Sequence, residues 1–113
     1  MEKNSVKEFM EYNEDKFTKR VIYKNEGTTA FVLNFMPDQS LPAHKHPGSV
    51  VYLYAITGNG TIIIDGKESE ISEADLIQVG SGEEMAFKNS GSDPVSLYVV
   101  LSKVPNENYA KNI

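Results

Sequence analysis

The chain has 113 residues, the size of one ordinary domain, which predicts a single domain over residues 1–113. Its formal net charge is −5 and its lysines and arginines are scattered, which argues against nucleic acid or a membrane surface as a partner. The sequence contains no cysteine, so disulfides, thiolate nucleophiles and cysteine-ligated metals are excluded.

The first ten residues, "MEKNSVKEFM", are charged from the second residue and lack an apolar core. They do not have the pattern of a signal peptide. No apolar run approaches the length that crosses a bilayer. These features predict a cytoplasmic protein.

The first expected element is a short helix over residues 5–13. Ser5 and Glu8 have the spacing of a capping box, in which each side chain satisfies a backbone N–H at the helix start. Val6, Phe9 and Met10 would share one face at helical spacing. So short a helix needs a surface to pack on, because it is marginal in isolation.

After this segment the apolar pattern alternates, which is typical of strands. Residues 36–43, "MPDQSLPA", contain two prolines and are expected to form a loop, and Asp65-Gly66 is a hairpin signal. Strands at spacings of about ten residues predict an all-β sandwich or barrel. The expected strands are 18–24, 28–36, 50–56, 61–65, 68–71, 75–79, 84–89 and 95–101.

Both histidines of the chain lie in one short stretch, as His44 and His46. Residues i and i+2 of a strand point to the same face, so both imidazoles could face a barrel interior and bind one ion. The alternative is that the histidines bind no metal and are neutral imidazoles in a pocket, hydrogen-bonded to each other or to a ligand.

Two sequence blocks resemble the cupin family. Its first block has a glycine, an HxH motif, a glutamate and a further glycine, and "DQSLPAHKHPGSVVYLYAITG" matches with His44, His46 and Gly58. Its second block has Gly-Asp, Pro-x-Gly, a histidine and an asparagine, and "ADLIQVGSGEEMAFKN" matches with three residues: Asp75, Gly82 and Asn89. The overlap covers about residues 30–102. It implies a cupin-type jelly-roll β-barrel, also called a double-stranded β-helix.

The departures from the family bear on chemistry. In cupins the two histidines of HxH, the glutamate and the second-block histidine hold one metal ion. By register, Val51 takes the place of that glutamate and Met85 the place of that histidine. Three further departures affect turns: Asp38 and Ala74 replace glycines, and Gly80 replaces the proline.

The sequence allows two interpretations: a metal site that lacks two of the four family ligands, or a pocket that binds no metal. A divalent zinc, nickel, iron or manganese ion would need ligands beyond the histidines. Glu83 and Glu84 are the nearest substitutes by sequence, alternation favours Glu83 because it shares the parity of Met85, and Gln78 is another possible oxygen ligand. Met85 is a soft thioether, suited to Cu(I) rather than to hard ions. Alternation places Val51, Leu53, Met85 and Phe87 on inward faces, as pocket walls or simply as barrel core.

Tyr52, Tyr54 and Tyr98 have the opposite parity and should lie on the outer sheet face. This face is expected to form a homodimer interface or to pack under the N-terminal segment, and the two can hold together. The sequence thus predicts a cupin that binds a small molecule. The alternative is a metal-dependent oxygenase or isomerase, and the sequence leaves open whether the chain is an enzyme.

Overall fold

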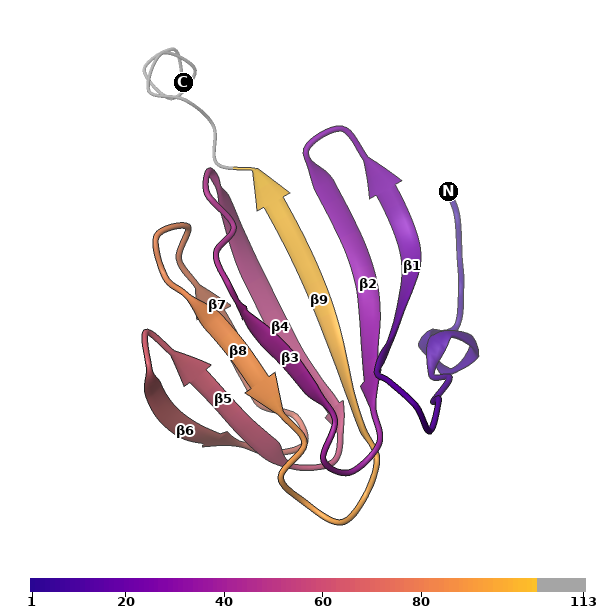
Figure 1. The fold of residues 1–113 in the computed structure, drawn as a ribbon. Helices are drawn as coiled ribbons and strands as arrows, with labels where there is room; N and C mark the ends of the chain where they lie inside the picture. Colours follow the sequence, from indigo (N-terminus) through magenta and orange to yellow (C-terminus); the bar gives the residue numbers. More distant parts are fainter. Residues whose placement is uncertain (104–113) are drawn as a thin grey trace.

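The computed structural model describes residues 1–103, so the last ten residues of the predicted domain lie outside it. Two antiparallel sheets face each other (Figure 1), with strand orders β1-β2-β9-β4-β7 and β3-β8-β5-β6. This arrangement confirms the predicted jelly-roll. The strands are β1 (Thr18–Asn25), β2 (Thr28–Phe35), β3 (Ser40–His44), β4 (Ser49–Thr57), β5 (Gly60–Ile64), β6 (Lys67–Ile71), β7 (Leu76–Val79), β8 (Met85–Lys88) and β9 (Val95–Lys103). Within residues 1–103, no helix has the length and apolarity needed to cross a membrane.

Strand β3 corrects the sequence-based expectation of a loop at residues 36–43. Leu41 pairs with Phe87 and His44 pairs with Met85, so β3 has two residues between these pairs where β8 has only Ala86. This irregularity lies at Pro42 and Ala43, and a bulge is where a sheet tolerates proline. The bulge interrupts the alternation of inward-facing and outward-facing residues along β3. A search for apolar residues at every second position therefore does not detect this strand.

The N-terminal element is a 3-10 helix, η1 (Val6–Phe9), instead of the expected helix over residues 5–13. Ser5 makes no side-chain cap, so the predicted capping box is wrong. Polar groups of this segment instead form hydrogen bonds with strands β2 and β9. The Phe9 carbonyl accepts a hydrogen bond from Asn34 Nδ2 at 2.9 Å, and the Tyr12 hydroxyl is hydrogen-bonded to Ser96 Oγ. These tertiary bonds replace the local bonds that would have continued a helix.

Several turn residues have positive φ angles. Asp65 and Gly66 have φ angles of 50° and 79°, as the predicted hairpin turn requires. Asp38 and Ala74, which replace family glycines, have φ angles of 70° and 74°. Both therefore occupy the left-handed region, which glycine adopts without a Cβ penalty. The family's preference for glycine at these two places has a direct physical reason.

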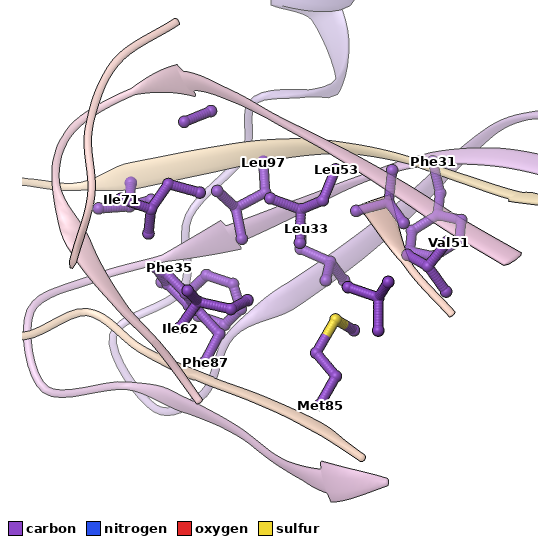
Figure 2. Packing of buried hydrophobic residues seen from close by; sticks show 14 residues of the cluster. Phe31, Leu33, Phe35, Val51, Leu53, Ile62, Ile71, Met85, Phe87 and Leu97 are labelled. Atoms are coloured by element: carbon purple, nitrogen blue, oxygen red, sulfur yellow. The ribbon is translucent and has the colours of Figure 1, made fainter. Parts of the chain in front are cut away.

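The core fills the space between the sheets. Phe31, Leu33 and Phe35 of β2 share the interior face, as their alternation predicts. Figure 2 shows that Phe31, Val51 and Met85 lie toward one end of the hydrophobic cluster and Ile71 toward the other. The end that contains Val51 and Met85 is the part of the core next to the two histidines.

Candidate functional site

A cavity of about 130 Å³ opens beside the two histidines. Its walls are almost entirely apolar, and three nitrogen-bearing side chains complete the lining. The lining residues are Phe17, Phe31, Leu33, Leu41, Val51, Met85, Val99 and Leu101, with Lys19, His44 and His46. Leu33, Val51, Met85 and Val99 are almost fully buried, whereas Lys19 and both histidines are more accessible to solvent. The cavity is thus apolar in its depth and polar at its mouth.

The two histidines reach the mouth by different routes. His44 is the last residue of β3, where the bulge turns it to the same side as Leu41. His46 lies beyond the strand, in the segment before β4, so the expectation that both sit on one strand is wrong. Their rings still meet, with centroids 4.6 Å apart and planes at 81°, in an edge-to-face contact. The predicted pairing of the imidazoles is therefore achieved by a bulge and a turn.

Hydrogen bonding indicates the proton position on His44, and burial affects the protonation of His46. His44 Nδ1 lies 2.7 Å from the Pro42 carbonyl oxygen, and because a carbonyl only accepts, this nitrogen donates. Burial lowers the pKa of His46, and the neighbouring His44 and the Lys19 charge lower it further. Each cause disfavours the imidazolium form, so His46 is biased toward the neutral imidazole.

The four positions that the family resemblance assigns to metal ligands do converge. His44, His46, Val51 and Met85 all line the cavity, and Met85 is the direct cross-strand neighbour of His44. The register predicted from the sequence blocks is therefore consistent with the structure. Because Val51 and Met85 fill the other two places, the result is an apolar cavity with an imidazole pair.

The other predicted site residues lie elsewhere. Glu83 Oε1 accepts a hydrogen bond from the Gly80 N–H at 2.7 Å, which closes the turn before β8. Gln78 is exposed and donates to the Tyr52 hydroxyl at 3.4 Å on the outer face, because its strand neighbour Val79 points inward. Leu53 and Phe87 belong to the core cluster, as predicted, but do not line the cavity.

This donor set does not fit a divalent ion. Within residues 1–103, no group of three or more histidine, aspartate or glutamate side chains is placed to hold a metal. Two imidazoles fall short of the three protein ligands usual for zinc or non-haem iron. Val51 offers no donor atom and Met85 only a soft thioether. The Lys19 ammonium at the same mouth adds a positive charge that would repel a cation.

Sequence reasoning missed most of the cavity lining. The alternation pattern did not single out Phe17, Lys19, Leu41, Val99 or Leu101, and it placed Phe31 and Leu33 only on one strand face. The alternation of β9 carried a usable signal for Val99, since Leu97, Val99 and Leu101 share one parity. Phe17 and Lys19 had no such signal, because the segment that contains them precedes the matched blocks.

The fold and the site together define a cupin, and the chain belongs to this family: the model described as a cupin domain matches residues 31–101. Among curated proteins, the chain is 27% identical over 78 residues to the tetracenomycin polyketide synthase protein TcmJ of Streptomyces glaucescens, covering 67% of this chain and 52% of that protein. It is 29% identical over 65 residues to the oxalate-binding protein of Thermotoga maritima, covering 58% and 54%. The chain thus spans about half the length of these two relatives.

Solved structures share the fold. The protein TT1209 from Thermus thermophilus superposes with a TM-score of 0.86 at 24% identity, over 93% of this chain and 100% of that one. An uncharacterized conserved protein with a double-stranded β-helix domain, from Klebsiella pneumoniae, has a TM-score of 0.85 at 19% identity, over 91% and 90%. At these identities the likeness is one of fold alone.

Proposed function

We propose that the protein is a small-molecule-binding cupin whose ligand occupies the cavity beside His44 and His46. The observation that carries this proposal is the lining: buried apolar walls under a mouth with three polar side chains. Binding sites for small molecules typically combine apolar walls with a few polar groups that orient the ligand. A wholly structural core would have no reason to keep such a space open, since protein interiors are close-packed.

The size of the cavity limits the ligand. Its volume of about 130 Å³ is close to that of an engineered apolar cavity, of about 150 Å³, that holds one benzene ring. The buried part of the ligand is therefore about one six-membered ring or a short branched chain. One curated relative is named as an oxalate-binding protein, and this name supports the proposal that the present cupin also binds a small organic molecule.

The competing function is a metal-dependent oxygenase or isomerase. The observation that favours it is the His44 ring, whose Nδ1 is held by the Pro42 carbonyl and whose second nitrogen is left for another partner. The incomplete donor set disfavours it. Elemental analysis of protein purified without a tag or chelator, beside the double variant His44→Ala, His46→Ala, separates the two functions. About one metal per chain, lost in the variant, would favour the enzyme.

A ligand titration tests the binding function directly. One-ring compounds with neutral, acidic and basic substituents are added while the backbone amide signals are followed by NMR. We expect saturable shifts at residues that line the cavity. Val51→Phe should abolish them by filling the cavity, whereas Tyr52→Phe, one residue away on the opposite face, should not. If no compound binds at millimolar concentration, or if Val51→Phe binds as well as the parent, the proposal fails.

We also propose that the chain forms a homodimer through the outer face of β4 and β7. Tyr52, Tyr54 and Leu76 are 42%, 38% and 70% exposed there, because the N-terminal segment covers β1, β2 and part of β9 instead. Their cross-strand neighbours Tyr98, Val100 and Gln78 are uncharged as well. A second copy can cover such a face without burying any charge, which is the usual condition for an interface core.

A further inference from the structure

The cavity lining includes the positively charged side chain of Lys19 and no negatively charged one. Lys19 lies on β1, and the register of β1 with β2 sets it opposite Leu33, a residue of the cavity wall. The lining contains no aspartate or glutamate, although acidic residues outnumber basic ones in the whole chain, 16 to 11. Within residues 1–103, the ion pair found joins Arg20 to Glu11, and no carboxylate pairs with Lys19. The mouth is thus a locally positive place on an acidic protein.

The Lys19 ammonium is also positioned. Its Nζ lies over the ring of Phe31, 4.6 Å from the ring centroid, in a cation–π contact. Phe31 is itself buried and lines the cavity, so the contact holds the charge at the edge of the apolar wall. A lysine stem that packs along apolar surface with its head in water is a common arrangement, and here the head borders the opening.

The imidazoles add a hydrogen-bond donor at the same mouth. His44 uses its Nδ1–H on the Pro42 carbonyl. His46 has one ring N–H in either neutral tautomer and two when it is protonated. Burial, His44 and Lys19, in that order, lower the pKa of His46, so the charge of Lys19 is felt at this ring. Lys19 and His46 therefore act on the same small volume.

We infer that the ligand is a small amphipathic anion: an aromatic or short branched-chain carboxylate whose apolar body fills the cavity and whose negative group sits at the mouth beside Lys19 and His46. This inference rests on the proposed binding function and names its ligand class. A cation would meet the Lys19 charge without compensation, and a doubly charged small acid would have no partner for an anionic group among Leu33, Val51 and Val99. One anionic end and one apolar end match the polarity of the cavity.

Three probes of one shape and different charge test the inference. Benzoate, benzamide and benzamidinium carry charges of about −1, 0 and +1 at about pH 7.5, and each has the single ring that the volume accepts. Their dissociation constants are measured by NMR titration at low ionic strength. We expect benzoate to bind about tenfold tighter than benzamide, and benzamidinium to bind weakest, because the mouth is positive.

Two matched variants identify the charge responsible. Lys19→Met keeps the apolar stem and removes the ammonium, and should weaken benzoate about fivefold while leaving benzamide within about twofold, as fits one exposed charge. Lys24→Met, an exposed position on the same strand outside the lining, removes the same net charge and should change neither constant.

The outcomes separate this inference from the proposed function. If benzamide binds as tightly as benzoate, the cavity binds small molecules but not by their negative charge, and only the inference is overturned. The same holds if Lys19→Met weakens both compounds equally, since Lys19 would then serve as a wall. If none of the three compounds binds at millimolar concentration, both the inference and the binding function on which it rests are contradicted.

Discussion

Replacement of Ala74 by glycine should make the protein more stable. Ala74 has a φ angle of 74°, and its N–H donates to the Ala55 carbonyl at 2.7 Å, so tertiary structure holds it in the left-handed region. That conformation costs an L-residue about 1–2 kcal/mol. Glycine avoids this cost but loses about 0.4–1 kcal/mol through a more flexible unfolded chain. The expected net gain is about 0.5–1 kcal/mol, or a rise of about 2–8 °C in Tm.

Urea unfolding, followed by circular dichroism, measures this gain as an increase in the midpoint at constant slope. Gly66→Ala is the reverse control, because Gly66 has a φ angle of 79° and a Cβ there would meet no atom within 4 Å. It should lose about 1 kcal/mol through backbone strain alone. Ala86→Gly in strand β8 controls for chain flexibility and should also destabilise. If Ala74→Gly loses stability as Ala86→Gly does, the strain at Ala74 is refuted.

Two further predictions concern the acid range and the outer face. The pKa of folded His46 is below its ordinary value of 6.5, so below that pH the unfolded chain takes up the proton first and stability falls. His46→Gln should flatten the fall in urea midpoints below about pH 6.5, and equal curves for parent and variant would contradict it. On the outer face, Tyr52→Ser or Tyr54→Ser should convert the proposed dimer to monomer in sedimentation experiments without weakening ligand binding. Tyr23→Ser, outside the proposed interface, should leave the dimer intact, and a parent protein that is monomeric at about 100 μM would refute the interface.

Local chemistry in the sequence predicted much of the barrel. The alternation of residues 28–36 correctly placed Phe31, Leu33 and Phe35 on the interior face, because the side chains of a strand alternate strictly between its two faces. Asp65-Gly66 correctly marked a hairpin, since its backbone angles are a property of two adjacent residues. The same logic failed at β3, where a bulge around Pro42 shifts the alternation by one residue.

Some residues of the candidate site were also predicted correctly from the sequence, and others were not. The family blocks assigned four positions to one site, and His44, His46, Val51 and Met85 do share a cavity wall. The two further oxygen ligands suggested from the sequence, Glu83 and Gln78, do not line this cavity. Glu83 closes its own turn, and Gln78 faces the opposite side of the sheet. Nearness along the chain says little about nearness in space once a strand directs neighbouring residues to opposite faces.

Short-range periodicity in the sequence predicted an all-β barrel, and the resemblance of two sequence blocks to cupins predicted the fold family and a shared site for His44 and His46. The same resemblance implies that Val51 and Met85 stand at two of the family's metal-ligand positions. Only the tertiary structure decided that Lys19 reaches the cavity mouth. Its strand must pair with β2 before the ammonium can lie over Phe31, and Lys19 is separated from His44 by more than twenty residues of chain. This juxtaposition depends on two irregularities: the register shift between Val21 and Tyr23 in the β1–β2 pair, and the bulge in β3 that turns His44 to the same cavity. Strand alternation alone reveals neither.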